Sequence, residues 1–201
     1  AITGTQIESG KGLWINMWGH NGNLKADSNA AEMDNKGFGM MLGVDAYSSD
    51  KTTLGVALGY EQNELNIDSN RQSSADTEAV HLMAYGRTSA GVIDIKSGIG
   101  YSWVNADTTR YVSVGSLASK NEASYDAGLF QIFVEGSHTF KLNENASLTP
   151  YANLAYQSLK TDSFVENGVA AQLMGDSHTD SVTVSTLGGR GVWALNKNSK
   201  V

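Results

Sequence analysis

The sequence predicts an antiparallel transmembrane β-barrel, and three observations lead to that fold class. Apolar residues alternate with small or polar residues in eight segments, the connections between these segments alternate between long and short, and 22 glycines accompany a single proline. Glycine-rich loops normally carry proline as well, so the glycines are expected inside regular structure. No run of about 18 apolar residues occurs, so a membrane-spanning helix is excluded and any crossing of a bilayer is made by strands.

The alternation is clearest in 53–61, where Leu54, Val56, Leu58 and Tyr60 share one face and small or polar residues occupy the other. Side chains of a strand point alternately to its two faces, so this pattern fits a strand between lipid and a polar lumen, whereas a helix would mix the two sets. Proline is tolerated near the start of a strand, where Pro150 stands. The eight predicted strands are 13–20, 38–47, 53–61, 79–87, 93–103, 128–138, 148–157 and 182–195.

Long and short connections alternate along the chain. Long polar segments over 23–36, 68–77, 106–123 and 161–179 take turns with short ones over 48–51, 88–91 and 141–146. Outer-membrane barrels have short periplasmic turns and long extracellular loops, whereas a soluble lipocalin-like cup or a sandwich has no reason to sort its loops by side. Aromatic residues near the strand ends fit an interfacial girdle or ordinary core packing equally: Trp14, Trp18, Tyr47, Tyr60, Tyr101, Trp103 and Trp193.

The composition excludes several kinds of chemical site and binding partner. The chain has no cysteine, which removes thiolate metal sites, thiol catalysis and disulfides, and suits an envelope protein. Its formal charge is −7 with scattered basic residues, so nucleic acid is not an expected partner. The first ten residues carry neither a basic nor an apolar leader region, so a signal peptide, if present, is expected further upstream or already removed.

Several segments, in this order and spacing, resemble the β-domain of classical autotransporters, the type V secretion proteins of Gram-negative bacteria. GLWINMWG at 12–19 is similar to the first strand of that family, GFGMMLGVD at 37–45 to the second and LGVALGY at 54–60 to the third. LTPYANLAYQ at 148–157 is similar to the seventh, and FVENGVAAQL at 164–173 and STLGGR at 185–190 to the loop and strand that follow. The resemblance runs across almost the whole chain.

This resemblance implies an outer-membrane translocator that is folded into the lipid by the barrel-assembly machinery and exports an N-terminal passenger. The family barrel has twelve strands, ends on an aromatic residue and begins after a pore-plugging helix. Here eight strands are predicted, and 196–201 reads as a periplasmic turn leading into a ninth. We therefore expect residues 1–11 to be a remnant of the passenger or linker, and 12–201 to be the barrel domain, truncated at its C-terminus.

Alternation also assigns side chains to the lumen. The residues predicted to face it are Asp45, Glu61, Asp94, Lys96, Gln131, Glu135 and Arg190. The same charges would form the solvated face if the sheet belonged to a soluble protein. Ile93, Ile95 and Ile99 lie on the opposite face, which is expected to contact lipid.

Other functions find less support in the sequence. Catalysis would draw on His20, His81, His138 or His178, the last within a local Asp176-Ser177-His178 run, but adjacent loop residues rarely converge in catalytic geometry. The histidines are far apart and no metal-binding motif occurs, so no metal or cofactor is expected. The alternative within the same fold class is a free-standing eight-stranded barrel acting as an adhesin or structural anchor.

Overall fold

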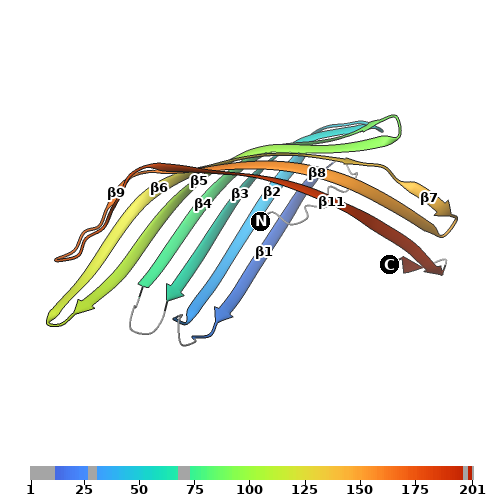
Figure 1. Ribbon diagram of the computed structural model, residues 1–201. Helices are drawn as coiled ribbons and strands as arrows, with labels where there is room; N and C mark the ends of the chain where they lie inside the picture. The colour runs from blue at the N-terminus through green and yellow to red at the C-terminus, as the bar shows by residue number, and fades with distance from the viewer. Residues whose placement is uncertain (1–11, 27–30, 68–72, 197–198, 201) are drawn as a thin grey trace.

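Eight long antiparallel strands form one curved sheet, shaped as part of a barrel, in the computed structural model (Figure 1). The structure describes residues 12–26, 31–67, 73–196 and 199–200; the predicted linker remnant 1–11 lies outside them. The long strands are β1 (Leu13–Leu24), β2 (Met33–Ser48), β3 (Thr52–Ile67), β4 (Ser73–Ala90), β5 (Ile93–Val114), β6 (Leu117–Ser137), β8 (Ala146–Thr161) and β11 (His178–Asn196). Each contains one of the eight predicted strands, except that β6 ends one residue before the predicted 128–138, so the predicted all-β antiparallel fold is confirmed.

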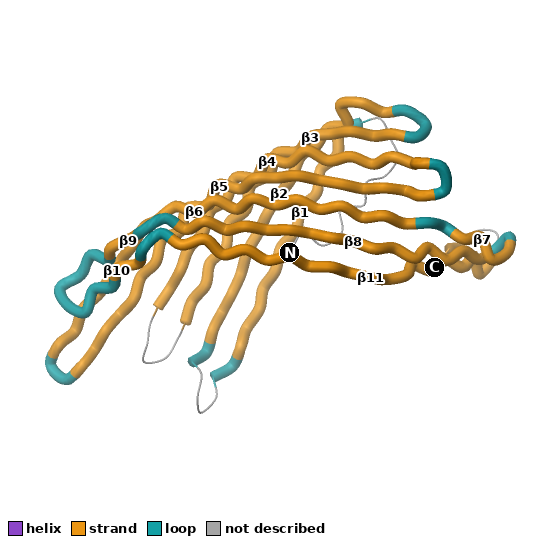
Figure 2. Tube along the Cα trace, turned by 45° about the horizontal axis from the view of Figure 1, so that its top comes forward, coloured by secondary structure: helices purple, strands orange, loops and turns teal. Residues whose placement is uncertain are grey.

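Four short strands complete the architecture over the described residues. They are β7 (Phe140–Asn143), which pairs with β8, the hairpin of β9 (Phe164–Val165) and β10 (Met174–Gly175), and β12 (Ser199–Lys200) beside β11. The order across the main sheet is β1-β2-β3-β4-β5-β6-β8-β11-β12, so neighbours in sequence are neighbours in space (Figure 2). No helix in the described part of the chain is long and apolar enough to cross a membrane.

The sheet does not close on itself within the described residues. β1 pairs with β2, and β11 pairs with β8 and β12, so β1 and β12 stand at opposite edges. A closed eight-stranded barrel would require β1 to pair with β11. The arrangement found therefore does not support the free-standing eight-stranded alternative.

The expected long loops are shorter than the sequence suggested, because the strands continue into them. The segment 106–123 belongs to β5 and β6, which are joined by two residues, one of them Gly115 in the left-handed region at φ 62°. Only glycine adopts that region without steric penalty. Polarity predicted a loop, but these strand extensions are polar on both faces, and inward polar residues such as Ser119 and Asn121 are buried. The connection 115–116 is thus as short as 91–92, and the strict alternation of loop lengths does not hold.

Pro150 lies inside β8 at a break in the ladder. β6 pairs with β8 as far as Ser137 opposite Tyr151, and β7 resumes the pairing at Phe140 opposite Leu148. Because proline has no N–H to donate, an interrupted ladder beside it leaves no partner carbonyl waiting for a missing donor. The Pro150 carbonyl still accepts from the backbone N–H of His138 at 3.2 Å.

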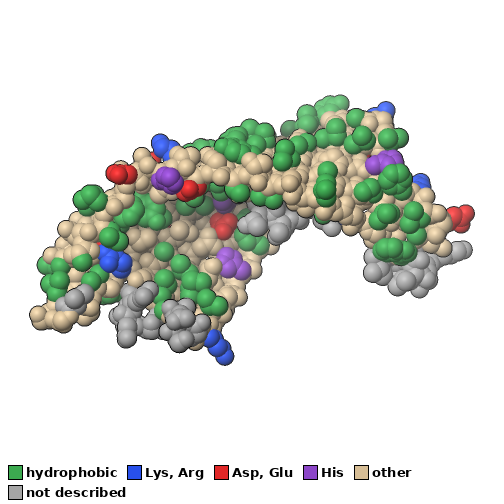
Figure 3. All heavy atoms as spheres, viewed as in Figure 1, with side chains coloured by type: hydrophobic (Ala, Val, Ile, Leu, Met, Phe, Trp, Pro, Cys, Tyr) green, Lys and Arg blue, Asp and Glu red, His purple; other side chains and the backbone are tan. Residues whose placement is uncertain are grey.

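The two faces of the sheet differ in kind. Hydrophobic side chains gather along the outer, convex surface (Figure 3), where Leu58 is 58% exposed and Ile99 47%. Five of the seven aromatic residues considered for a girdle are exposed: Tyr47, Tyr60, Tyr101, Trp103 and Trp193. Four of them follow the outward alternation, whereas Tyr47 has the inward parity of Asp45 and comes to lie opposite the outward Leu54 because the register shifts between Asp45 and Tyr47. The remaining two, Trp14 and Trp18, pack instead on the concave face against a buried cluster of Met41, Ala57 and Tyr85.

Glycines make room for these inward aromatic rings. A Cβ atom added to Gly43 would lie 2.2 Å from the Trp14 ring, and one added to Gly55 would lie 2.2 Å from the Tyr85 ring. Each ring occupies the space that a Cβ on the neighbouring strand would need, so the inner glycines are steric requirements of the packing.

Candidate functional site

The candidate site is a pocket of about 350 Å³ on the concave face, where β4, β5, β6, β8 and β11 come together. Strand register builds it, because residues directly opposed on neighbouring strands point to the same face. Gly100, Gln131 and Gln157 form one such row, and Lys96, Glu135 and Asn153 form another. Four of the seven residues predicted to face the lumen line this pocket: Lys96, Gln131, Glu135 and Arg190.

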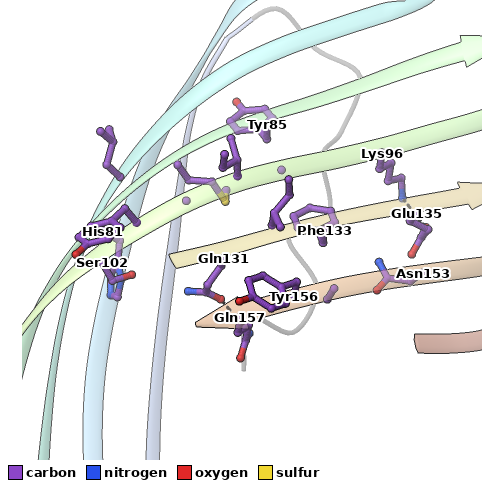
Figure 4. A pocket seen from close by; sticks show the side chains of 18 of the residues that line it. His81, Tyr85, Lys96, Ser102, Gln131, Phe133, Glu135, Asn153, Tyr156 and Gln157 are labelled. Atoms are coloured by element: carbon purple, nitrogen blue, oxygen red, sulfur yellow. Dashed lines mark hydrogen bonds and ion pairs between the residues drawn. The ribbon is translucent and has the colours of Figure 1, made fainter. Parts of the chain in front are cut away.

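A charged cluster occupies one end of the pocket. Arg190 donates to both carboxylate oxygens of Glu135 at 3.0 Å. The ammonium of Lys96 lies 3.7 Å from the same carboxylate (Figure 4). The guanidinium carbon also lies 4.1 Å from the ring centroid of Tyr151, within range of a cation–π contact. The Glu135 side chain is only 12% exposed, and the two cations neutralise its charge where little water reaches it.

The other end of the pocket carries neutral polar groups. Gln157 donates its side-chain amide to the amide oxygen of Gln131 at 3.0 Å, and His81 Nδ1 lies 2.7 Å from the Ser102 hydroxyl (Figure 4). Phe133 and Met83 add apolar surface to the pocket lining. The pocket therefore combines hydrogen-bonding groups with apolar surface.

The three remaining predicted residues lie on the same face, outside the pocket lining. Tyr85 donates its hydroxyl to Asp45 at 2.7 Å and accepts from the Trp14 indole at 2.6 Å. Asp94 accepts from the Ser89 hydroxyl at 2.5 Å, beside the turn at 91–92. These two carboxylates are held by hydroxyl groups, whereas Glu61 faces an imidazole.

Glu61, His81 and Ser102 come together in the order acid, base, hydroxyl. Glu61 Oε2 lies 3.6 Å from His81 Nε2, beyond hydrogen-bond distance, and Nε2 is buried with no partner among the described groups. Ser102 is 2% exposed, so its hydroxyl is closed to a substrate. This arrangement lacks the linked hydrogen bonds and the accessible nucleophile that covalent catalysis needs.

The other histidines considered for catalysis are dispersed. His20 lies 3.2 Å from the Asn35 amide oxygen, His138 contacts the backbone carbonyl of Val92, and His178 lies 3.0 Å from Asp180 on an exposed strand start. Within the described residues no three His, Asp or Glu side chains are arranged to hold a metal ion.

A second polar network, which the sequence reasoning missed, lies at the far end of the β5–β6 hairpin. Glu166, in the connection between β8 and β11, is 5% exposed and is bound by Arg110, and the neighbouring Asn121 and Ser119 are also buried. Arginine, glutamate, asparagine and serine are all common in solvent-exposed loops, so the composition gave no indication of this network. The Asn167-Gly168 pair was the one available signal of a tight turn there.

Comparison with known proteins places the chain in a family. A model of the autotransporter β-domain matches residues 13–201. Two extracellular serine proteases of Serratia marcescens are 34% and 33% identical over 177 and 187 residues, which is 88% and 92% of this chain but 17% and 18% of those proteins. The chain thus spans less than a fifth of the curated relatives that it matches, and their protease name describes those whole proteins.

The solved structures agree on the fold. The translocator domain of the autotransporter NalP from Neisseria meningitidis matches with a TM-score of 0.74 at 24% identity, over 92% of this chain and 62% of that one. Translocator β-domains of this family sit in the bacterial outer membrane and act as transporters. This chain therefore belongs to the autotransporter β-domain family and is an outer-membrane translocator domain.

Proposed function

We propose that this domain anchors a passenger attached before residue 12 and exports it to the cell surface along the concave face of the sheet. The proposal rests on the difference in side-chain chemistry between the concave and convex faces of the sheet. Charged and amide side chains line the concave pocket, whereas the convex face presents exposed Leu, Ile and Val. Such a surface meets lipid on one side and water on the other.

The concave side chains suit a polypeptide in transit. Asp45, Glu61, Asp94 and Glu135 are balanced in part by Lys96 and Arg190, and Gln131 offers both a donor and an acceptor. We propose that these seven residues line the lumen. Mixed charges and amides can exchange hydrogen bonds with a passing backbone in place of water, and no single strong charge excess would trap it.

The names of the relatives support an exported passenger, since the two Serratia proteins are called extracellular. We propose further that the barrel-assembly machinery inserts the domain. The support is physical, because unpaired strand edges cannot be left in hydrocarbon and must be paired during insertion. We propose residues 1–11 as the linker to the passenger and 12–201 as the membrane domain.

The test uses the full gene product with an epitope tag ahead of residue 1. The proposal expects the tag to become sensitive to protease added outside intact cells, and to stay protected in the periplasm when residues 12–201 are deleted. A second readout is the intact mass of the outer-membrane product, which should exceed 21.4 kDa if a passenger is attached. A tag delivered to the surface without residues 12–201 would overturn the proposed function.

A further inference from the structure

The connection between β8 and β11 runs beside the free edge of β6 (Figure 2), and its residues after Asn167 contact the inward side chains of the β5–β6 hairpin. Asn167 and Glu122 exchange two backbone hydrogen bonds at 2.9 and 2.7 Å, and Phe164 stacks on Tyr125 with ring centroids 5.0 Å apart. Tyr125 has the same alternation parity on β6 as Gln131. The connection therefore lies on the same face as the pocket.

One buried carboxylate holds this connection in place. Glu166 accepts from Arg110 Nε at 3.0 Å and Nη2 at 2.5 Å, and from the backbone N–H of Leu173 at 2.8 Å. Asn121 donates to the same carboxylate at 3.3 Å. Two-pronged recognition by arginine fixes both the position and the orientation of the carboxylate.

Side chains of β5 and β6 also bind the backbone of the connection. The Ser119 hydroxyl accepts from the N–H groups of Val169 and Ala170 at 3.0 and 3.1 Å. Arg110 and Asn121 donate to the carbonyl of Ala171 at 2.7 and 3.0 Å. Backbone groups of the connection are thus hydrogen-bonded to side chains of both β5 and β6.

The docked connection contains a strained residue, and the β5–β6 hairpin contacts it on one side only. Ala171 has φ at 52°, in the left-handed region that disfavours a side chain. The opposite side of the β9–β10 hairpin has Val165 and Met174, a directly opposed pair that is 65% and 80% exposed. The contacts with Arg110, Ser119 and Asn121 therefore hold a conformation that would relax once they break.

We propose that residues 162–177 form a lid at the extracellular mouth, latched shut on the concave face by Arg110 and Glu166, which must swing off while a polypeptide passes. This proposal rests on the export function proposed above. The lid occupies the face along which the polypeptide would move, and its attachments outside its two ends are made to β5 and β6. Opening therefore requires no change in the pairing of the long strands.

A reversible lock tests the lid in the full-length protein, which offers a cysteine-free background over this domain. A Cβ at Gly168 would lie 2.7 Å from Asn121 Cγ, the atom that a cysteine sulfur replaces, so the double variant Asn121→Cys and Gly168→Cys is placed to form a disulfide. The matched control is Ser113→Cys with Ala118→Cys, a directly opposed pair that closes the β5–β6 hairpin on itself.

Cells synthesise each variant in pulse-chase experiments with either oxidant or reductant present throughout. We expect lid-locked molecules, identified by mobility on non-reducing gels, to hold their passenger inside, whereas reductant restores delivery and the hairpin control delivers under both conditions. Delivery by locked molecules at the rate of reduced ones would overturn the lid, as would failure of the disulfide to form. If unmodified protein delivers no passenger, the proposed function fails and the lid with it.

Discussion

Arg190 and Glu135 lie 55 residues apart in sequence, yet the arginine donates to both carboxylate oxygens at 3.0 Å. β11 supplies one partner and β6 the other, with β8 between them, so the contact spans three strands of the sheet. A cross-strand pair of this kind reports directly on correct register.

Glu135→Gln should weaken this arrangement by leaving Lys96 and Arg190 without their shared counter-ion. We expect a loss of about 1 kcal/mol in the free energy of unfolding in detergent, since Arg190 is half exposed and solvent screens the pair. Denaturant titration of the full-length protein measures it. Pairing Glu135→Gln with Lys96→Gln should recover part of the loss, and an additive double variant would show that the cluster is not coupled.

Ile99→Arg should impair membrane assembly because Ile99 lies on the convex face, well inside β5. An arginine facing lipid at the midplane costs about 2–4 kcal/mol, whereas one facing a wet lumen costs little. The matched control is Gln131→Arg on the adjacent strand and the opposite face. Heat-modifiable mobility of the outer-membrane fraction gives the folded yield, and equal yields for the two variants would contradict lipid contact at Ile99.

The docking of residues 162–177 should depend on pH through Glu166. Hydrogen bonds from Arg110 hold the pKa of the Glu166 carboxyl below its ordinary value, against the opposing effect of burial. A lowered pKa in the docked state means that docking is strongest above the ordinary pKa and weakens as pH falls through the docked one. Hydrogen exchange of 162–177 across an acidic series should show protection fading in that window, and Glu166→Gln should remove the dependence.

Two substitutions in the connection should act in opposite directions. Ala171→Gly relieves the left-handed backbone strain at φ 52° and should stabilise the docked state by up to about 1 kcal/mol. Gly168→Ala places a Cβ 1.9 Å from Asn121 Oδ1, an atom that Asn121→Cys removes, so the connection should detach in the single variant. Limited proteolysis of residues 162–177 measures the docking in both variants. The barrel of Gly168→Ala should keep the gel mobility of the folded protein, since only local contacts are lost.

Sequence periodicity determined the eight long strands and which residues share a face, because a strand places every second side chain on the same side. The inward row from Lys96 to Ser102 and the outward row from Ile93 to Trp103 follow from counting along β5 alone. Polarity was a poorer guide to strand ends: 106–123 reads as a loop because polar side chains such as Ser119 and Asn121, which bind the β8–β11 connection, lie on its inward face.

Contacts between distant strands could not be read from one strand at a time. Periodicity places Arg190 and Glu135 on one face, but only the register of β6, β8 and β11 brings them within 3.0 Å. Likewise, Arg110 and Glu166 are separated by 56 residues and meet because the connection folds back onto the β5–β6 hairpin. The sequence by itself therefore determined the strands and their faces, which depend on local backbone geometry. The tertiary structure alone decided the ion pairs and the docked connection, which depend on how far each strand is shifted against its neighbour.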